Sequence, residues 1–600
     1  MTRVALKIVG AQGQGVNSVG EMCARGLKRA GYCVFGYREY MSIIKGGHSS
    51  YQLDVAAEEV RSTVRGVDIL VSFNHHGLEE NLFEVKHGGI VLHQTGDWEP
   101  STEHVAFLQR RGIAVFHLPV QEVLYRLDAK PILANVLIAS VVWGLLGRRQ
   151  TEVEALVKEQ FGHKKDLLAA NMKCIDEGFS YLSSHPKKTS VTLPKPKASW
   201  GSHLLVTGSQ AMGLGIVHAG CRLYAGYPMT PSSPLLSFIA DTQNETGIVV
   251  KQAEDEITAA QIMSGAMFAG TRAITATSGG GFDLMSETVS LNGIIENPSV
   301  FVLAQRPGPG TGLPTWTAQG DLLLAVCAGH GEFPRIVLSV SDSQDCFDLL
   351  PEAFNLAEEY QTPVIVLTDK QIAEALFTQA PFNQKRAKVR RGRLVTKSAD
   401  LKKLTSADRF DPKARDGVSP RWLPGSNAAT YCAQGDEHSP DGSVDESAAN
   451  AHAQMEKRMK KQKAIAARLP EPELWSVVRG KASIVKDPST LDLLIVGWGS
   501  TKGIVLDSIE ELARSSKLEA RNCAYLHYTY LWPLHTKRFA LLAKKAKRVV
   551  LVEQNHTGQL GMLLRQSSGI EIADRILGFD GRPFFLEDFT KRLTTFLPKR

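Results

Sequence analysis

An acidic segment contains the residues of this sequence best suited to proton transfer. Glu254, Asp255 and Glu256 follow an apolar run and precede a helical stretch rich in Ala, Met and Gly. Acids at a helix start most often interact with the helix dipole. Helical spacing separates the three, because Glu256 falls on the same face as Ala259, Ala260, Met263 and Met267. We therefore predict that Glu256 points into a buried site as a proton donor or acceptor, with Glu254 as a neighbouring cofactor contact.

Two further segments favour binding of an anion. Thr230 precedes Pro231, a combination typical of a helix start, where backbone N–H groups and the helix dipole attract negative charge. Arg306 follows an apolar run and precedes a rigid loop, PGPGTGLPT, that ends at Thr315. A guanidinium in that setting suits bidentate capture of a carboxylate. We predict that Thr230 and Arg306 form two sides of one anion site; the alternatives are an ordinary helix cap and a surface salt bridge.

Three glycine-rich segments are candidates for close contact with a ligand. The SGGG segment at 278–281 lacks side-chain bulk, so that a flat ligand can lie against its backbone. GAQGQG at 10–15 and KGGHSS at 45–50 have the glycines, cation and hydroxyls of a phosphate-binding turn. Flexible or polar turns are the alternative for each. The candidate contacts are Ser278, Gly279, Gly280, Gly13, Gly15, Lys45, Gly46, Gly47, His48 and Ser49.

Parallel β-sheets would position these residues in a multidomain, doubly wound α/β fold. Apolar runs at 204–207, 248–251, 273–277, 300–304 and 363–368 alternate with helical stretches, as is typical of that fold. Ligands bind such sheets at the carboxyl ends of the strands, and the acidic, glycine-rich and arginine segments all follow these runs. The N-terminal glycine turn lacks GxGxxG spacing and an acidic residue after the second strand, which disfavours a nicotinamide site.

Composition divides the chain into five parts. Prolines and lysines at 186–200 predict a linker without packed secondary structure, and a charged helix is expected at 454–469. The strand, glycine turn and helix pattern recurs at 493–503, where we expect a structural rather than a phosphate-binding turn. The predicted parts are an N-terminal domain at 1–185, the linker at 186–200, a second domain at 201–383, an extended connector at 384–488 and a final domain at 489–600.

Charge, cysteine content and hydropathy limit the possible functions. The 600 residues carry a net charge of +7, and the basic run that begins at Gln384 lacks interleaved aromatic residues, so we expect no nucleic acid partner. The eight cysteines form no CxxC pair, which favours a reducing compartment and no iron–sulfur cluster on this chain. The apolar run at 131–147 is shorter than the roughly 20 residues of a spanning helix. We expect it to be a buried helix in a cytoplasmic protein.

In combination, these motifs resemble a known enzyme family. YPMTPSS at 227–233, QAEDEI at 252–257, TATSGGG at 275–281 and QRPGPGTGLPT at 305–315 resemble the alpha subunit of 2-oxoacid:ferredoxin oxidoreductases, especially the 2-oxoglutarate type. GAQGQG and the segment YREYMSIIKGGHSSYQ at 37–52 resemble the gamma component of the same enzymes, here fused ahead of the alpha part. The resemblance covers nearly the whole chain.

The resemblance implies roles for residues of the second domain. This domain would bind the pyrimidine half of thiamine diphosphate, with Glu256 protonating the aminopyrimidine and Pro228 beside the cofactor. Thr230, Arg306 and Thr315 match positions that contact the carboxylate and carbonyl of the 2-oxoacid.

The resemblance also assigns the flanking domains and leaves one question open. The N-terminal domain would contribute to coenzyme A binding, and the final domain would be a transketolase C-terminal-like domain. The sequence departs from the family pattern at Trp316, where a lysine is frequent, and in the PGPG that follows Arg306. These departures leave the side chain of the preferred substrate open.

The sequence contains only half of a thiamine site. It has no GDG motif with a following Asn, which would bind magnesium and the diphosphate. In the family that half, together with a [4Fe-4S] cluster, belongs to a beta subunit. The resemblance therefore implies an (alpha-beta)2 heterotetramer that passes electrons to ferredoxin.

We predict that the complex oxidatively decarboxylates 2-oxoglutarate onto coenzyme A, or runs the reverse carboxylation, a CO2 fixation of the reductive TCA cycle type. One alternative is the same chemistry on pyruvate, branched-chain 2-oxoacids or indolepyruvate. The other is a non-catalytic coenzyme A- or nucleotide-binding scaffold, which would not need Glu256.

Overall fold

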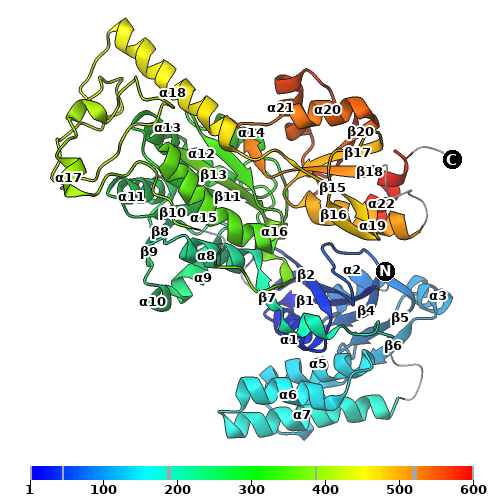
Figure 1. Cartoon of the computed structure of the whole chain (residues 1–600). Coiled ribbons are helices and arrows are strands. Elements are labelled where there is room, and N and C mark those ends of the chain that lie inside the picture. Colours follow the sequence, from blue (N-terminus) through cyan, green and yellow to red (C-terminus); the bar gives the residue numbers. More distant parts are fainter. Residues whose placement is uncertain (1–2, 44–45, 186–190, 386–387, 516–522, 598–600) are drawn as a thin grey trace. The chain divides into compact units, whose positions relative to one another are not determined.

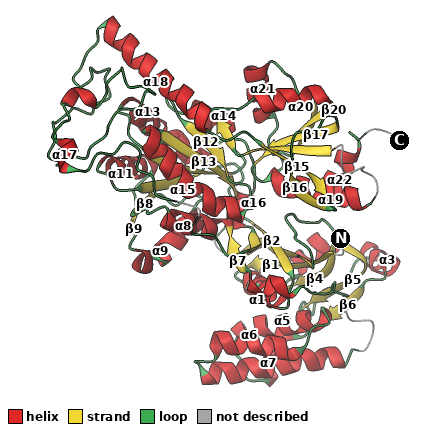
Figure 2. Ribbon diagram, in the orientation of Figure 1, coloured by secondary structure: helices red, strands yellow, loops and turns green. Residues whose placement is uncertain are grey.

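The chain folds into two compact α/β units. The computed structural model describes residues 3–43, 46–185, 191–385, 388–515 and 523–597 (Figure 1). Unit 1 comprises Met1–Val206, Ala375–Pro381 and Phe584–Phe589, and unit 2 comprises Thr207–Glu374, Phe382–Pro583 and Thr590–Arg600. The described residues form three sheets, each flanked by helices (Figure 2). The α/β fold class predicted from the sequence is confirmed.

Unit 1 is built on an eight-stranded sheet in the order β6-β5-β4-β1-β3-β2-β14-β7. Strands β1, β4, β5 and β6 are parallel, whereas β3, β2 and β14 add antiparallel pairs. The strands are β1 (Arg3–Gln12), β2 (Cys33–Tyr40), β3 (Gly46–Ala56), β4 (Val67–Ser72), β5 (Val85–His93), β6 (Ala114–His117), β7 (Leu204–Thr207) and β14 (Leu376–Gln379). The helices are α1 (Val16–Arg29), α2 (His75–Leu82), α3 (Thr102–Arg111), α4 (Val120–Arg126), α5 (Ala134–Leu145), α6 (Gln150–Phe161) and α7 (Lys165–Ser183).

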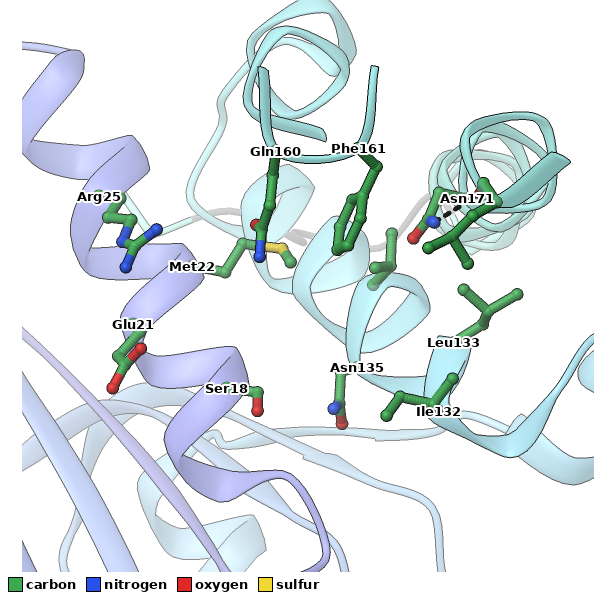
Figure 3. A pocket seen from close by; sticks show the side chains of 12 residues that line it. Ser18, Glu21, Met22, Arg25, Ile132, Leu133, Asn135, Gln160, Phe161 and Asn171 are labelled. Atoms are coloured by element: carbon green, nitrogen blue, oxygen red, sulfur yellow. Dashed lines mark hydrogen bonds between the residues drawn. The ribbon is translucent and has the colours of Figure 1, made fainter. Parts of the chain in front are cut away.

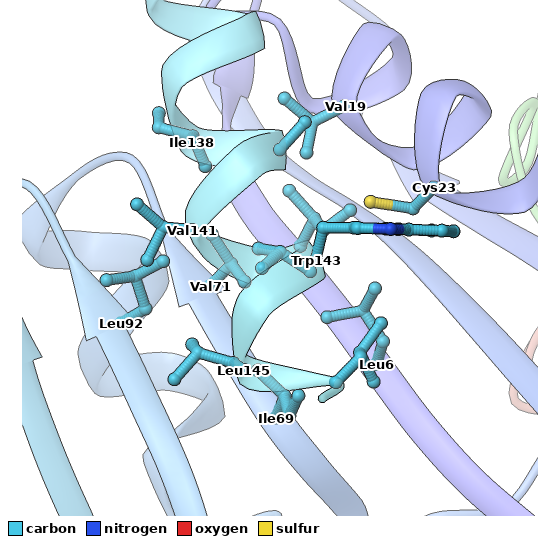
Figure 4. Close-up of a cluster of buried hydrophobic side chains, with 14 of the residues drawn as sticks. Leu6, Val19, Cys23, Ile69, Val71, Leu92, Ile138, Val141, Trp143 and Leu145 are labelled. Carbon is cyan, nitrogen blue, oxygen red and sulfur yellow. The ribbon is translucent and has the colours of Figure 1, made fainter. Parts of the chain in front are cut away.

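Helix α5 lies at the centre of the core of unit 1. Nine of its twelve residues are buried, as expected for the apolar run at 131–147. Figure 4 shows its Trp143 between the sheet residue Leu6 and Cys23 of α1. The indole Nε1 donates a 3.1 Å hydrogen bond to Glu152, so its one polar group is satisfied. No helix in the described part of the chain is long and apolar enough to cross a membrane.

Two details of unit 1 differ from the prediction. The run at 204–207 is a strand, but it forms the edge of the first sheet next to β14 and does not join the second sheet. The described end of the predicted linker also packs on unit 1, because Lys197 N–H donates to Gly31 O at 2.8 Å and the Tyr32 hydroxyl donates to Pro194 O at 2.9 Å. Both contacts are long-range in sequence, so local composition carries no signal for them.

Unit 2 contains two sheets. The seven-stranded sheet has the order β19-β12-β13-β11-β10-β8-β9, and its strands are parallel apart from β19. Its strands are β8 (Leu223–Gly226), β9 (Val249–Gln252), β10 (Ala273–Thr277), β11 (Ser299–Gln305), β12 (Ile336–Ser339), β13 (Pro363–Asp369) and β19 (Tyr530–Trp532). The associated helices are α8 (Gly208–His218), α9 (Ser233–Asp241), α10 (Gln243–Thr246), α11 (Glu256–Phe268), α12 (Gly279–Leu284), α13 (Ser286–Ile294), α14 (Leu322–Cys327), α15 (Ser343–Tyr360) and α16 (Lys370–Glu374).

The six-stranded sheet of unit 2 has the order β16-β15-β18-β17-β20-β21. Its strands are β15 (Glu473–Val478), β16 (Lys481–Ile484), β17 (Leu491–Trp498), β18 (Cys523–Tyr528), β20 (Ala546–Glu553) and β21 (Asp574–Leu577). The remaining helices are α17 (Ser398–Leu401), α18 (Ala448–Arg468), α19 (Thr501–Arg514), α20 (Lys537–Lys545), α21 (Gln559–Ser568) and α22 (Leu586–Thr594). Strand β19 follows β18 and pairs with β12, which joins the two sheets of unit 2.

Buried ion pairs attach helix α18 of the connector to the part of unit 2 that contains the seven-stranded sheet. Glu296, after α13, pairs with Lys457 and, at 2.6 Å, with Lys461. All three side chains are at most 3% exposed. The charged helix predicted at 454–469 is therefore the last part of a longer helix whose basic side chains reach a buried acid.

Candidate functional site

Four predicted segments meet at one edge of the seven-stranded sheet. Strands β9, β8, β10 and β11 are consecutive and parallel, so their carboxyl ends lie side by side. The acidic segment follows β9, the segment with Thr230 follows β8, the SGGG segment follows β10, and Arg306 follows β11. The strand-end argument from the sequence therefore predicted their neighbourhood correctly.

Glu256 is the buried acid of the site. It is the first residue of α11, where Asp255 caps the helix by accepting a 2.7 Å hydrogen bond from Thr258 N–H. Glu256 is 5% exposed, whereas Glu254 is exposed, as the helical phase predicts. The Glu256 Oε1 atom is buried and has no hydrogen-bond partner among the described residues. A buried carboxylate oxygen without a partner is costly unless a ligand supplies one.

The glycine segment lies directly against this carboxylate. Gly279, Gly280 and Gly281 form the first turn of α12 and are not a flexible turn. A Cβ on Gly281 would lie 2.1 Å from Thr277 Oγ1 and 2.8 Å from Glu256 Oε1, so only glycine fits there. The hydroxyl of Ser278, which precedes the helix, is buried and, within the part of the chain described, also lacks a partner.

Arg306 and Thr230 are in direct contact. The guanidinium Nη1 donates a 2.6 Å hydrogen bond to the carbonyl oxygen of Thr230. Arg306 is 8% exposed, and its burial lowers the pKa of its guanidinium, an effect that the nearby Asp321 opposes. The Arg306 guanidinium and the backbone at Thr230 thus line one corner of the site.

The predicted helix start at Thr230 is wrong. Helix α9 begins at Ser233, and Ser232 occupies the N-cap position. The Ser232 hydroxyl donates a 2.6 Å hydrogen bond to Met229 O, which closes a turn before the helix. Two prolines, Pro231 and Pro234, follow Thr230. Pro234, in the first turn of α9, is the one compatible with the helix, so the sequence signal was assigned to the wrong proline.

The loop after Arg306 is held by the C-terminal part of unit 2. Thr315 is 3% exposed. The next residue, Trp316, stacks under the Arg582 guanidinium, whose Cζ lies 3.8 Å from the ring centroid. Thr317 N–H donates a 3.0 Å hydrogen bond to Gly581 O. Position 316, where a lysine was expected from the family resemblance, therefore carries a tryptophan whose ring is covered by Arg582.

Asp321 is a site residue that the sequence reasoning missed. Its backbone N–H donates a 3.0 Å hydrogen bond to Gln305 Oε1, and a Cβ on Gly279 would lie 2.8 Å from Asp321 Oδ2. That oxygen is buried without a partner among the described residues. The only local signal was an acid after the arginine loop, in QGDLL.

The later glycine turn is filled by protein groups. Gln319 Nε2 donates a 2.9 Å hydrogen bond to Trp498 O, and a Cβ on Gly499 would lie 2.8 Å from that nitrogen and 3.0 Å from Ser339 Oγ. The side chain of Gln319 thus occupies the place beside the turn. This arrangement agrees with the structural role expected for 493–503.

Unit 1 brings together its two candidate phosphate segments. Gly13 and Gly15 lie in the turn between β1 and α1, with φ of 91° and 100°. Gly46, Gly47, His48 and Ser49 open strand β3 and are not an isolated turn; in the register, His48 lies opposite Ala11 and Ser49 opposite Gly10. Lys45 lies outside the described residues.

Side chains around this edge of unit 1 support the glycine turn. Gln14 Oε1 accepts a 3.1 Å hydrogen bond from Asn74, the residue that caps α2. Burial lowers the pKa of His48, so its imidazole is kept neutral. Its Nδ1 atom is buried with no partner in the described ranges. Asn74 was not predicted, because its proximity depends on the pairing of β4 with β1.

A cavity of about 350 Å³ lies elsewhere in unit 1, between α1, the end of α6 and the starts of α5 and α7. Figure 3 shows Glu21 and Arg25 of α1 on one side and Phe161 and Asn171 on the other. None of the predicted contacts lines it. The sequence therefore gave no indication of this cavity.

The arrangement in unit 2 fits a thiamine pyrimidine ring. A planar heterocycle with ring nitrogens needs a flat backbone surface and a carboxyl group for proton exchange, and Gly279–Gly281 and Glu256 offer both. The described residues contain no group of three or more His, Cys, Asp or Glu side chains able to hold a metal ion.

Comparisons with protein families agree with this geometry. Residues 214–458 match the model described as pyruvate flavodoxin/ferredoxin oxidoreductase, thiamine diP-binding, and residues 5–181 match that of pyruvate ferredoxin/flavodoxin oxidoreductase. The first match contains every predicted residue of the unit 2 site. This region of the chain is a thiamine diphosphate-binding domain.

Individual relatives cover the chain nearly end to end. The alpha subunit of a Sulfolobus 2-oxoacid:ferredoxin oxidoreductase is 31% identical over 98% of this chain and 96% of that protein. A 2-oxoglutarate oxidoreductase subunit KorA from Mycobacterium tuberculosis is 27% identical over 94% of this chain and 87% of its own length. The solved structure of 2-oxoglutarate:ferredoxin oxidoreductase from Magnetococcus marinus, with 2-oxoglutarate, coenzyme A and succinyl-CoA bound, matches 99% of this chain and 100% of that one, with a TM-score of 0.88 and 28% identity. The chain belongs to the alpha-subunit family of 2-oxoacid:ferredoxin oxidoreductases.

Proposed function

We propose that this chain is the alpha subunit of an enzyme that converts 2-oxoglutarate and coenzyme A into succinyl-CoA and CO2. Two electrons pass one at a time to ferredoxin, and the same complex can run the reverse carboxylation. The observation that carries the proposal is the buried, unpartnered Glu256 carboxylate against the glycine segment of a thiamine diphosphate-binding domain. A scaffold that only bound a nucleotide would have no use for that acid.

Glu256 would exchange a proton with the aminopyrimidine ring. Thiamine diphosphate, when bound, supplies the carbon nucleophile and the electron sink for decarboxylation. The atom available for this exchange is Glu256 Oε1, which is buried beside Gly281 and has no hydrogen-bond partner among the described residues. General acid–base groups of this kind contribute about 10² to 10⁴ in rate.

Arg306 and the backbone at Thr230 would orient the 2-oxoacid. The guanidinium uses Nη1 on the Thr230 carbonyl and keeps further N–H groups for a carboxylate. Thr315 ends the loop that leaves this arginine and is the proposed contact for the substrate carbonyl. Low exposure at Arg306 and Thr315 strengthens such charge-assisted contacts.

Unit 1 would bind coenzyme A at its glycine turn. The amino terminus of α1 and the adjacent start of β3 offer backbone N–H groups, the Ser49 hydroxyl and the neutral His48 imidazole to a phosphate or to the thiol end of the cofactor. The structure of the Magnetococcus relative, which has coenzyme A bound, supports the assignment of this ligand to the complex.

A beta subunit would complete the enzyme. We propose that it carries Mg²⁺, the diphosphate-binding half of the thiamine site and the [4Fe-4S] cluster, in an (alpha-beta)2 assembly. The absence of a GDG motif from the sequence and the eight free cysteines of this chain support that division.

The stacked Trp316 and Arg582 favour a second candidate substrate class. An aromatic residue where a lysine is frequent makes the end of the loop more apolar, which would suit pyruvate, branched-chain 2-oxoacids or indolepyruvate. The chemistry of Glu256 and Arg306 would be the same for all of these acids.

The change Glu256→Gln tests the thiamine assignment. In the complex purified with its partner, we expect 2-oxoacid-dependent turnover to fall by at least about 10², because the amide cannot exchange the proton. Thiamine diphosphate binding, followed by calorimetry, should weaken as well. Glu245→Gln, at an exposed position on α10, is the control and should change neither. Full turnover in Glu256→Gln would remove this residue from the mechanism.

A further inference from the structure

Two buried carboxylates, not one, flank the glycine segment after β10. Glu256 Oε1 faces Gly281 on one side, and Asp321 Oδ2 faces Gly279 on the other. Both oxygens are buried and lack a hydrogen-bond partner in the described part of the chain. The proposed function gives Glu256 a partner in the aminopyrimidine and leaves Asp321 without one. Because an unpartnered buried carboxyl is costly, Asp321 also requires an explanation.

The backbone of Asp321 is fixed by its neighbours. Its N–H donates a 3.0 Å hydrogen bond to Gln305 Oε1, while Gln305 itself donates to Thr368 O at 3.2 Å. Its carbonyl accepts a 2.9 Å hydrogen bond from Ala325 N–H in the first turn of α14. The side chain makes no capping hydrogen bond to that helix. The carboxyl group is therefore held in place by its backbone, while its buried Oδ2 atom makes no hydrogen bond within the described residues.

The charged groups that act on Asp321 are Asp283 on α12 and Arg306 after β11. Burial and the repulsion from Asp283 raise the pKa of Asp321 to about 6, and Arg306 opposes that rise. The carboxyl group therefore interacts electrostatically with the guanidinium proposed to bind substrate, and its backbone is hydrogen-bonded to Gln305, the residue before that arginine. It can gain or lose its proton within the pH range in which enzymes work.

We propose that Asp321 is a second binding group for the 2-oxoacid: in its protonated form, its carboxyl donates a hydrogen bond to the carboxylate that pairs with Arg306. Two carboxyl groups at close range share one proton, because both cannot be ionised without strong repulsion. Binding of the acid therefore takes up a proton whenever Asp321 is ionised beforehand. This inference rests on the proposed function, since it uses the same anion site.

The pH dependence of substrate binding separates this role from a structural one. In the complete complex, the KM for 2-oxoglutarate of the wild type should rise with pH above about 6, by at most tenfold per pH unit, the limit for uptake of one proton. Asp321→Asn should have a KM that is nearly constant with pH and close to the low-pH value of the wild type, because the amide donates at every pH. Asp241→Asn, at the exposed last residue of α9, should keep the wild-type profile.

Proton uptake provides a test without an Asp321 variant. Calorimetric titration of 2-oxoglutarate into a complex with Glu256→Gln, which slows the chemistry, is repeated in buffers of different ionisation enthalpy. At pH 8 we expect uptake approaching one proton per acid bound, and none when Asp321→Asn is added. No uptake with Asp321 intact, or a KM that still rises with pH in Asp321→Asn, would overturn the inference while leaving the proposed function in place. A wild-type complex that neither binds nor converts any 2-oxoacid would overturn both.

Discussion

In the proposed mechanism, recognition of the substrate carboxylate depends on the side chain of Arg306. It is nearly buried and already directed by the Thr230 carbonyl, so its remaining N–H groups have a fixed direction. Removal of one partner of a buried, hydrogen-bonded charge pair costs about 2 to 5 kcal/mol. This free-energy cost should appear in the binding of 2-oxoacids. In the described ranges, the Arg306 guanidinium pairs with no acidic side chain within 4.0 Å.

The variant Arg306→Ala should lower kcat/KM for 2-oxoglutarate by about 30-fold to several thousand-fold, which corresponds to that cost. Arg306→Lys should recover part of the loss, because it restores the charge but not the bidentate geometry. Arg415→Ala, an exposed position in the connector, is the control for loss of an arginine. Steady-state kinetics of the complex measure all three. Unchanged kcat/KM in Arg306→Ala would exclude this arginine from the site.

At the scale of single residues, the sequence correctly predicted burial where burial follows from helical periodicity. The position of Glu256 follows from helical phase, and it is buried while Glu254 is exposed. Asp321 was not predicted, since its burial arises only when α12 and the end of β11 fold against it. Thr230 was misassigned as a helix cap because two prolines, Pro231 and Pro234, compete for the same local signal.

The connector helix α18 depends on one buried acid. Burial alone would raise the pKa of Glu296, but Lys457, Lys461 and Arg409 hold it well below its ordinary value. Because the folded-state pKa lies below the unfolded one, the contribution of Glu296 to stability is present above about pH 4.3. It is lost as the pH falls through the folded-state pKa.

The change Glu296→Gln should destabilise unit 2 by about 3 to 5 kcal/mol, because it leaves two buried lysines without their counter-charge. Adding Lys457→Met and Lys461→Met should recover much of the loss. Asp400→Asn removes an exposed partner of Lys403 and should cost less than about 1 kcal/mol. Thermal unfolding at pH 7 followed by tryptophan fluorescence gives the comparison. Equal midpoints for Glu296→Gln and Asp400→Asn would mean that the buried cluster does not hold the helix.

At the scale of elements, local patterns predicted four strands of the seven-stranded sheet, β9, β10, β11 and β13, and assigned to it one strand of another sheet. The run at 273–277 corresponds to β10 with the same bounds, whereas the run at 204–207 belongs to the sheet of unit 1. An edge strand has the same local pattern in either sheet, so its partner is decided by long-range packing. The same limit explains why the segment at 45–50 was expected as a turn, whereas its described residues, Gly46 onward, form the start of β3.

At the scale of the whole molecule, the proposal places both substrate-binding parts on this chain and assigns half of the cofactor site to a partner subunit. Glu256 and the glycine segment fit the pyrimidine ring, while the eight cysteines are free and the sequence lacks the diphosphate motif. Family membership follows from relatives that cover nearly the whole chain. We propose that the preferred acid depends on contacts with the substrate side chain near Trp316, where the sequence departs from the pattern expected for the family.

The most direct test is coenzyme A-dependent viologen reduction by the complex purified from its source organism through a tag on this chain. Initial rates are measured in parallel with 2-oxoglutarate, pyruvate, 2-oxoisovalerate and indolepyruvate. We expect activity with 2-oxoacids that requires coenzyme A and is greatest with 2-oxoglutarate. A higher kcat/KM for one of the other acids would contradict the substrate assignment, and no reduction with any acid, while a thiamine-containing partner is bound, would contradict the catalytic role itself.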